Sequence, residues 1–591
     1  MNKLDMESKN IIESNIEKLK ELFPSCVQED KIDFDMLKQE LSSVVIDDKK
    51  EKYQLTWPGK KESILNANKP ITKTLRPLRE KSIDFDNTEN IYIEGDNLEV
   101  LKILQESYLN KIKCIYIDPP YNTGNDFVYN DSFDKSVEDE NYDNGSTDEY
   151  GNRLVSNPSS NGRFHSDWLS MMYSRIKLAR NLLKQDGVMF ISIDSNEYDN
   201  LKKACDEIFG ENSLISDFIV IRSEGGGLAK YVVKGHDYLL AYAKDINHVS
   251  PLAREKDIRG KIVEKNGEKY WVQEDWLRKE FGKYGNCHYE EVLEYKGQGT
   301  LDEINTGLES GKYILVPKDN GMNIVGKLRK VDDDYSKFYS ILKHLNKNGV
   351  DDLKQLGMDE YFSYPKPLSL LEELIKGATF FKNDKDAIIL DFFSGSATTA
   401  HAVMKLNAKD NGRRKYIMVQ VSEQVEFKEY STICDIGEER IRRAAKSIEE
   451  ETNANIDYGF RVYKVDSSNM KDVYYKPSEL GQTDLFDLIS NIKEDRTPED
   501  LLTQVMLDLG LTLDLKIEEK TILNNKVYYV ADNALVACFD DNVDINIIDE
   551  ICKCKPLKVV FKDMSFKSDK DKINLEERVK KLSPDTEISI L

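Results

Sequence analysis

The chain lacks the features that mark secreted and membrane proteins. Eight cysteines in 591 residues are scattered, and the lone C-x-C of Cys552 and Cys554 has no partner pair, so neither a disulfide framework nor a zinc site is predicted. No apolar run approaches the about 20 residues that span a bilayer. The polar start, MNKLDMESKN, has no apolar signal segment. These absences predict a cytoplasmic protein without a membrane partner.

Positive charge is scarce overall, because the formal net charge is -23. Nucleic-acid binding needs concentrated Lys and Arg, but only locally. Residues 254–283 carry nine Lys/Arg against seven Asp/Glu, with Trp271 and Trp276 among them, and a second basic cluster runs from Lys60 to Lys81. Each run alone is ordinarily a solvated surface. The six histidines show no metal-ligand spacing, so no metal site is predicted.

The order of apolar segments predicts a large α/β protein. Strands are expected at 91–93, 114–117, 188–193, 388–391 and 416–421, and helices at 98–104, from Ser166 to Gly187, and at 198–209. Strand, helix, strand is the unit of a parallel sheet. The length allows about four domains of ordinary size. The predicted segments are an N-terminal helical module (1–50), two parts of one α/β core (51–221 and 356–468), an insertion between them (222–355) and a C-terminal α/β domain (469–591).

Residues Asp118, Pro119, Pro120 and Tyr121 directly follow the predicted strand 114–117. The Asp118 carboxylate and the Pro119 carbonyl can each accept one hydrogen bond from an exocyclic NH2 group. The Tyr121 ring offers a stacking face for a base extruded from the helix. The two prolines fix φ near about -65° and so hold the acceptors in place. This tetrapeptide predicts a catalytic site for methylation of an amino group.

A second candidate site follows the predicted strand 388–391. The sequence Asp391-Phe392-Phe393-Ser394-Gly395-Ser396-Ala397-Thr398-Thr399 ends a strand and opens a helix. In a doubly wound sheet such a turn binds a nucleotide-like ligand, because glycine permits close approach and the helix start offers free N–H groups. It is neither a G-x-G-x-x-G fingerprint nor a P-loop. Glu423, at the end of the next strand, is placed to accept hydrogen bonds from ribose hydroxyls.

Together these motifs resemble the amino-methyltransferases that act on DNA. Asp118 to Tyr121 resembles their catalytic motif, and Asp391 to Gly395 resembles their S-adenosylmethionine loop, with Ala397 where a second glycine is expected. The catalytic motif comes first, which is the circularly permuted order of the β class with a Rossmann-like sheet. The resemblance implies that Lys366 and Pro367, in Tyr-Pro-Lys-Pro-Leu, help to hold the methionine part. It implies that Asp96 contacts the adenosine.

More specifically, the sequence is similar to the modification (Mod) subunit of type III restriction-modification systems. The similarity includes YQLTWPGKK at 53–61, FRVYKVDSSNM at 460–470 and GQTDLFDLI at 481–489. It implies adenine-N6 methylation of double-stranded DNA, with the insertion as target-recognition domain. It also implies a homodimer and a helicase-nuclease (Res) partner, for which the C-terminal domain is our candidate docking site.

Several alternatives stay open. Cytosine N4 presents the same NH2 group, although an Asp in the first motif position favours adenine. Cytosine C5 methylation needs a cysteine nucleophile, and the chain has no Pro-Cys dipeptide. An orphan methyltransferase without a nuclease partner, or one acting on RNA or protein, would keep the chemistry. A regulatory DNA-binding subunit with a decayed site is disfavoured by intact Asp118, Tyr121, Lys366 and Gly395.

Overall fold

The computed structural model describes most of the chain from residue 55 onward. The described residues are 55–124, 127–129, 154–156, 162–224, 231–258, 260–265, 267–280, 285–331, 334–381, 384–471, 492–541, 543–566 and 569–591, with 2–3, 15–16, 19, 27–28, 31–32, 34 and 37. The predicted helical module at 1–50 and the 481–489 motif therefore fall outside them, apart from those few residues. No described helix is long and apolar enough to cross a membrane.

A ten-stranded mixed sheet forms the centre of the larger compact unit, which excludes 251–338 and 380–383. Its order is β18 (Ile341–Lys343), β10 (Leu214–Ile221), β11 (His236–Ala243), β9 (Leu183–Ile193), β6 (Ile112–Ile117), β19 (Ile388–Asp391), β20 (Lys415–Gln420), β5 (Ile91–Glu94), β21 (Arg461–Asp466) and β4 (Thr74–Pro77). The six strands from β9 to β21 are parallel. Strands such as β6 are buried throughout, as apolar runs between two helical layers must be.

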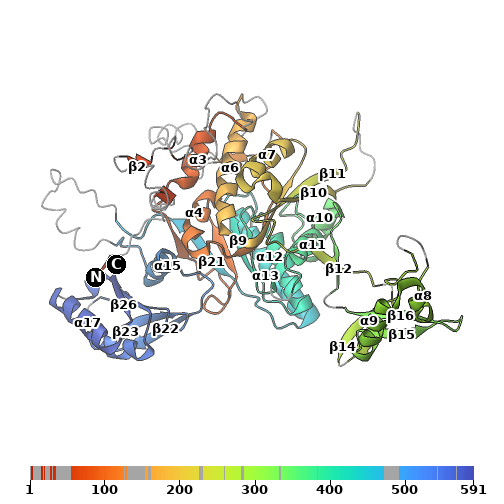
Figure 1. Ribbon diagram of the computed structural model, residues 1–591. Helices are drawn as coiled ribbons and strands as arrows, with labels where there is room; N and C mark the ends of the chain where they lie inside the picture. Colours follow the sequence, from red (N-terminus) through yellow and green to blue (C-terminus); the bar gives the residue numbers. More distant parts are fainter. Residues whose placement is uncertain are drawn as a thin grey trace. The chain divides into compact units, whose positions relative to one another are not determined.

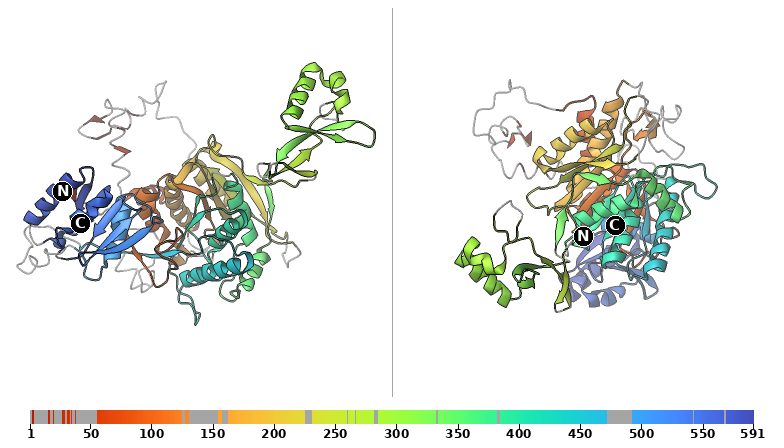
Figure 2. Two further views of the ribbon diagram at one scale, coloured as in Figure 1. Left: turned by 90° about the horizontal axis from the view of Figure 1, so that it is seen from below. Right: turned by 90° about the vertical axis from the view of Figure 1, so that its right-hand side faces the viewer.

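Helices cover both faces of this sheet (Figure 1; Figure 2). One layer contains α4 (Asn97–Tyr108), α6 (Phe164–Leu182) and α7 (Tyr198–Phe209), and the other contains α11 (Leu368–Ala378), α12 (Thr398–Asp410) and α13 (Ile433–Thr452). The chain leaves β6 through α6 and leaves β19 through α12, so the strand order reverses between these neighbours. Right-handed crossovers then place the two helices on opposite faces. This topology confirms the predicted doubly wound sheet, and ligands of such sheets bind at the reversal.

One predicted element is wrong. The helix expected to end at Gly187 stops at Leu182, and β9 begins at Leu183. The β6–β9 pairing shifts there from Ile112↔Leu183 to Cys114↔Val188, so β9 bulges over the residues between. A Cβ on Gly187 would lie 3.1 Å from the backbone oxygen of Ile112. The glycine therefore permits close approach of two strands and does not cap a helix.

The C-terminal region builds a second sheet and packs on the core. Its order is β1 (Asn2–Lys3), β26 (Glu587–Ile590), β25 (Lys558–Phe561), β24 (Leu535–Cys538), β23 (Asn525–Val530) and β22 (Ile517–Ile522). Two helices, α16 (Ile547–Ile551) and α17 (Asp569–Leu582), accompany it. Because β1 pairs with β26, the two ends of the chain lie side by side (Figure 1).

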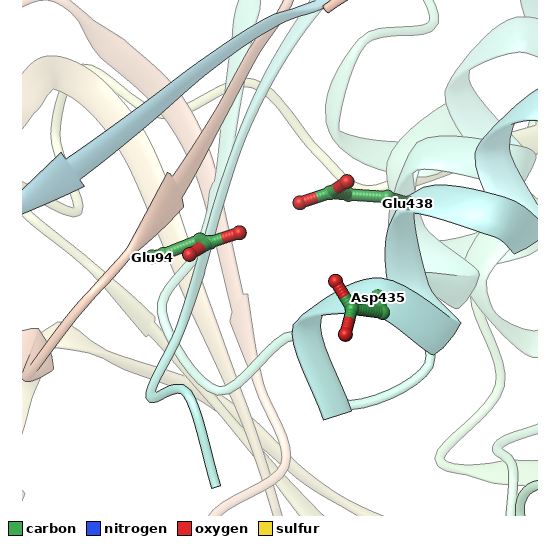
Figure 3. A group of neighbouring side chains, drawn as sticks. All are labelled: Glu94, Asp435 and Glu438. Atoms are coloured by element: carbon green, nitrogen blue, oxygen red, sulfur yellow. The ribbon is translucent and has the colours of Figure 1, made fainter. Parts of the chain in front are cut away.

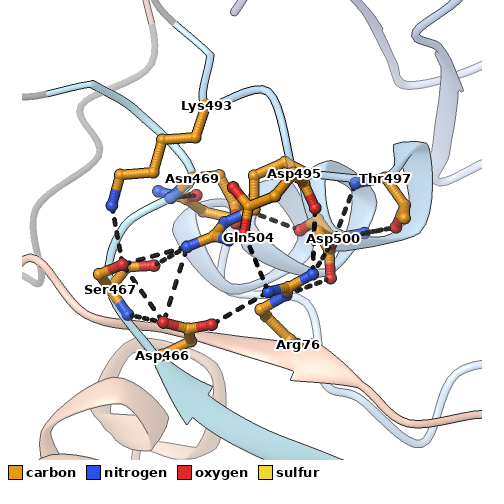
Figure 4. A network of polar contacts seen from close by, with 10 residues as sticks. Arg76, Asp466, Ser467, Asn469, Lys493, Asp495, Thr497, Asp500 and Gln504 are labelled. Atoms are coloured by element: carbon orange, nitrogen blue, oxygen red, sulfur yellow. Dashed lines mark hydrogen bonds and ion pairs between the residues drawn. The ribbon is translucent and has the colours of Figure 1, made fainter.

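A polar network joins this region to the main sheet (Figure 4). Arg76 of β4 contacts Asp466 of β21 at 3.1 Å and Asp500 of α15 (Pro498–Asp508) at 3.1 Å. Arg79 and Lys81, in the same basic cluster, also pair with acidic residues. These three cations thus stabilise the fold and are not an open phosphate-binding surface.

The smaller compact unit comprises 251–338, which lies inside the predicted insertion (222–355), and 380–383, which falls in the predicted second part of the core. It contains an antiparallel sheet in the order β13 (Ile262–Lys265), β14 (Glu268–Gln273), β16 (Asn323–Lys330) and β15 (Tyr313–Pro317), the pair β12 (Ala253–Glu255) and β17 (Tyr335–Lys337), and helices α8 (Val292–Lys296) and α9 (Gln298–Glu309). Trp276 stacks on Tyr313 with ring centroids 5.0 Å apart, and Trp271 donates to Asp334. Both tryptophans therefore belong to the packing of this unit.

Candidate active site at the carboxyl edge of the main sheet

The two predicted motifs lie at the same edge of the sheet. β6 and β19 are parallel neighbours with Ile115 opposite Leu390, so the loops after Ile117 and Asp391 leave the sheet side by side. We call residues 118–122 the catalytic loop and residues 391–397 the cofactor loop. The sequence places these loops more than 270 positions apart, and the sheet brings them together at the reversal of strand order.

Asp118 is the centre of the catalytic loop. Its Oδ1 accepts a hydrogen bond from the Tyr121 hydroxyl at 3.0 Å, and its Oδ2 accepts one from Lys366 Nζ at 2.5 Å. The side chain remains 26% exposed, so it can still be reached. A carboxylate has about four lone-pair sites, which leaves room for a further donor. Lys366, predicted as a cofactor residue, is thus also the counter-charge of the predicted catalytic acid.

Tyr121 presents a half-buried ring next to this ion pair. Lys366 Nζ lies 5.0 Å from the ring centroid. Burial and the adjacent Asp118 raise the pKa of Tyr121 well above its usual value, so the hydroxyl keeps its proton and donates to Asp118. The ring orientation is thereby coupled to the carboxylate, as a stacking platform beside an acceptor requires.

The two proline carbonyls of the catalytic loop differ in their partners. Trp168 Nε1, on α6, donates to the Pro120 carbonyl at 2.7 Å. The Pro119 carbonyl accepts no hydrogen bond from any residue that the structure describes. Of the two, only the Pro119 carbonyl is therefore available to a ligand, and it is the one expected to act together with Asp118.

A buried glutamate fixes the end of the catalytic loop. Asn122 has a left-handed backbone (φ 58°), and its side-chain amide donates to Glu197 Oε1 at 2.6 Å. Glu197 is fully buried and also contacts His165 Nδ1 at 2.6 Å and Asn200 Nδ2 at 2.7 Å. Its two carboxylate oxygens thus hold the loop, the start of α6 and the start of α7 together.

Asp391 begins the cofactor loop as a fully buried carboxylate. It accepts hydrogen bonds from the Thr399 hydroxyl at 2.6 Å and from the Phe393 amide at 3.1 Å, which fold the loop back onto the start of α12. Burial raises the pKa of Asp391 to about 7, although both hydrogen bonds act in the opposite direction. No described cation pairs directly with this acid, and the charge of Lys366 only partly offsets the effect of burial on its pKa, so a positively charged ligand would favour the ionised form.

The backbone of the cofactor loop turns through two left-handed residues. Gly395 has φ 48°, and its amide donates to Gln420 Oε1 at 2.8 Å. Ala397 has φ 59° and ψ 40°, a conformation that costs a residue with a side chain roughly 1–2 kcal/mol. The position of the family's second glycine is therefore conformationally special here also, and alanine occupies it with strain.

The polar groups at this edge fit a nucleoside with a cationic tail. Ser394 Oγ is buried without a hydrogen-bond partner, and the Glu423 carboxylate has no side-chain partner among the described residues. Burial raises the pKa of Glu423. Gly395 carries no side chain where the ring of Phe362 approaches its backbone. Unsatisfied acceptors and donors beside an open glycine are what a ligand with hydroxyl and amino groups needs.

Asp96 caps a helix in addition to its predicted contact with the ligand. Its Oδ1 accepts from the Leu98 and Glu99 amides and so caps α4, while Oδ2 accepts from Arg175 Nη2 at 3.3 Å. The next residue, Asn97, donates to the Phe392 carbonyl at 2.8 Å. The start of α4 therefore also supports the cofactor loop. Pro367 precedes α11 as its N-cap, directly after Lys366.

A cluster of three acids near this edge does not need a metal ion. The carboxylates of Glu94, Asp435 and Glu438 converge (Figure 3). Lys81 Nζ lies 2.5 Å from Glu94 Oε1 and 2.9 Å from Asp435 Oδ1 and thus supplies the positive charge. Burial raises the pKa of Glu438 to about 8, which lowers the negative charge further.

Comparison with known proteins identifies the family of this chain. Residues 112–446 match the N6_N4_Mtase family, described as DNA methylase. The Mod subunit of the Escherichia coli enzyme EcoP15I is 29% identical, with 95% of this chain and 94% of the relative covered. The Mod subunit of StyLTI from Salmonella typhimurium is 34% identical over 71% and 67%. The chain belongs to the Mod subunits of the N6/N4 DNA methylase family. A type II methyltransferase, M.KpnI of Klebsiella pneumoniae, is 30% identical over 59% of this chain and 82% of its own.

This assignment confirms the predicted DNA methyltransferase activity and the predicted cofactor, S-adenosylmethionine. The Mod subunit has the predicted motif residues at one sheet edge, from Asp118 to Tyr121 and from Asp391 to Ser396, with Lys366 between the loops. Four supporting residues were missed from the sequence: Trp168, Glu197, Arg175 and Arg440. Each lies on another element and bonds to a motif or to a motif neighbour, so no local pattern could reveal it.

Proposed function

We propose that this Mod subunit transfers a methyl group from S-adenosylmethionine to N6 of an adenine in double-stranded DNA. The observation that carries the proposal is the pairing of two acceptors, the Asp118 carboxylate and the available Pro119 carbonyl, beside the buried Asp391 of the adjacent loop. Two acceptors side by side match the two N–H bonds of an amino group.

The residues of the catalytic loop have distinct roles in this proposal. S-adenosylmethionine, when bound, supplies an electrophilic methyl group. Asp118 and the Pro119 carbonyl hold the N–H bonds of the target amino group, which lets the nitrogen lone pair leave the plane of the ring and turn toward that methyl group. The new N–C bond would replace the S–CH3 bond, whose electron pair stays on sulfur, and the methylated nitrogen would release one proton to water. Tyr121 stacks on the extruded base. Trp168 and Glu197 keep the two acceptors in register through Pro120 and Asn122.

The cofactor loop and its neighbours would hold the donor. Asp391 and Gly395 form the base of its site, Ser394 and Ser396 offer hydroxyl groups, and Phe393 offers its ring next to them. Glu423 would accept hydrogen bonds from the ribose, and Asp96 would face the adenosine. Lys366 and Pro367 would lie along the methionine part, where the ammonium of Lys366 already balances Asp118.

Cytosine N4 is the second candidate substrate, since its amino group presents the same pair of N–H bonds. The two are separated by incubating the purified protein with methyl-tritiated S-adenosylmethionine and double-stranded DNA, digesting the DNA to nucleosides and identifying the labelled one. We expect N6-methyladenine. Label in N4-methylcytosine would support the alternative, and no label in DNA at all would contradict the proposal. Long-read sequencing of DNA from expressing cells then gives the recognised sequence.

We also propose the assembly that the names of its relatives suggest. The protein would act in the cytoplasm as a homodimer and bind a Res helicase-nuclease subunit. The matched length supports this assignment, because 95% of the chain aligns with a Mod subunit but 59% with the type II enzyme, which has no Mod name. Gel filtration with a Res subunit encoded beside it tests the partner. A protein that methylates but never binds Res would be an orphan methyltransferase.

A further inference from the structure

Helix α13 passes close to the cofactor loop. Gly437 makes this approach possible, because a Cβ there would lie 3.2 Å from the Gly395 carbonyl oxygen and 2.8 Å from the Tyr92 hydroxyl. Residues three positions apart share one face of a helix. Arg440 therefore points from α13 toward the same loop.

Arg440 bonds to both neighbours of the strained alanine. Its Nη1 donates to Ser396 Oγ at 2.8 Å and to Thr398 Oγ1 at 2.6 Å. Between these residues Ala397 holds its left-handed backbone, at the first turn of α12, without any side-chain cap. One guanidinium nitrogen thus fixes the loop on each side of the position where the backbone is least favourable.

Burying the Arg440 guanidinium costs folding free energy, which indicates that this residue has a role other than stabilising the fold. The side chain is fully buried, and its Nε and Nη2 atoms have no hydrogen-bond partner among the described residues. Burial lowers its pKa to about 10, and among the described residues the charge of Asp352 acts against this effect. A buried ion of this kind is commonly replaced by an apolar side chain without loss of stability.

We infer that Arg440 is a positioning residue that holds the cofactor loop in its left-handed form, offsetting the strain at Ala397. This inference rests on the proposed use of S-adenosylmethionine. Arg440 would touch neither donor nor DNA, and would act through Ser396 and Thr398. Glycine at position 397 adopts the left-handed form without strain. The contribution of Arg440 should therefore depend on which residue occupies position 397.

The test is a double-mutant cycle of Arg440→Met and Ala397→Gly, read by calorimetry with S-adenosylmethionine. We expect Arg440→Met to raise both the Kd and the KM for S-adenosylmethionine about tenfold. The kcat at saturating cofactor and the KM for DNA should stay within about twofold of the wild-type values. In the Ala397→Gly background the same Arg440→Met change should raise Kd no more than about twofold. Arg414→Met is the matched control, because Arg414 is equally buried but precedes β20 at the other edge of the sheet.

Two results would overturn the inference: wild-type affinity in Arg440→Met, or a tenfold loss that persists in the Ala397→Gly background. Should Arg440→Met fail to fold, Thr398→Val removes one of the two hydrogen bonds at a residue that is not proposed to contact the donor, and its loss of affinity must also shrink in the Ala397→Gly background. If the wild-type protein itself binds no S-adenosylmethionine, the proposed function fails, and that outcome is distinct from a failed cycle.

Discussion

The two loops of the site are fixed in opposite ways. The catalytic loop is stiff in its own sequence, with two prolines, and it is held at Pro120 by Trp168 and at Asn122 by Glu197. The cofactor loop has no proline and depends on left-handed backbone turns held from α13. The acids of the two loops differ as well, since Asp118 is accessible and paired with Lys366, whereas Asp391 is buried and has no directly paired cation among the described residues. The first loop is ready for its substrate, while the second is completed by a charged ligand.

Removing Asp118 should have the largest effect and distinguish most clearly the role of the catalytic loop in methyl transfer from that of the cofactor loop in binding. Asp118→Ala deletes one of two acceptors for the target amino group, so we expect kcat to fall by about 100- to 1000-fold, as for loss of a preorganised hydrogen-bonding group. Affinity for S-adenosylmethionine should change only a few-fold. Tritiated-methyl transfer and calorimetry measure the two quantities.

Asp194→Ala is the matched control, since Asp194 follows the next strand, β9, and contacts only Asn196 among the described residues. Transfer should fall less than about threefold. Near wild-type turnover in Asp118→Ala would refute its catalytic role. Tyr121→Ala should likewise lose transfer while retaining the cofactor, because it removes the stacking ring.

Glu197→Gln tests the outer support of the catalytic loop. One carboxylate oxygen becomes an NH2 group facing donors from Asn122 or Asn200, so a buried hydrogen bond is lost at a cost of about 1–3 kcal/mol in unfolding free energy. We expect kcat to fall about tenfold with an unchanged Kd for S-adenosylmethionine. Glu207→Gln, which contacts Lys60 and Tyr173 instead, is the control. Equal losses in both variants would mean that Glu197 has no special link to the loop.

The buried acid of the cofactor loop predicts a pH dependence. Asp391 has a pKa of about 7, raised by burial, and a cationic ligand favours its ionised form. The Kd for S-adenosylmethionine should therefore rise about tenfold from pH 8 to pH 6. Folding stability should rise while affinity falls, because a carboxyl group with a raised pKa in the folded state stabilises that state as the pH falls from 7 toward 4. Asp391→Asn should abolish both dependences, and an unaltered pH profile in this variant would exclude Asp391 as their source.

Trp168→Phe should have the smallest effect. It keeps the packed ring but removes the hydrogen bond to the Pro120 carbonyl, so we expect a loss of about 1 kcal/mol in stability and a two- to fivefold fall in kcat. Thermal unfolding and transfer assays measure both. An unchanged kcat would show that the loop keeps its form without this hydrogen bond.

The sequence predicted what is local and missed what tertiary packing creates. Asp118 to Tyr121 and Asp391 to Ser396 could be recognised because their chemistry is concentrated in a few consecutive residues. Glu197 follows Asn122 by 75 positions, and Lys366 follows Asp118 by 248. Only the fold makes them partners. The bulge at Gly187 was missed for a related reason, because glycine marks both helix ends and close strand contacts, and the sequence does not say which.

The hydrogen bond from Trp168 to the Pro120 carbonyl also bears on how many methyl groups the enzyme adds to one nitrogen. With that carbonyl engaged, the proposed site offers an amino group two acceptors, Asp118 and the Pro119 carbonyl. A nitrogen that already carries one methyl group has a single hydrogen left and must leave one of them unpaired, which weakens its hold by about 1–3 kcal/mol. The product would then depart after one addition, and a dimethylated base would not form.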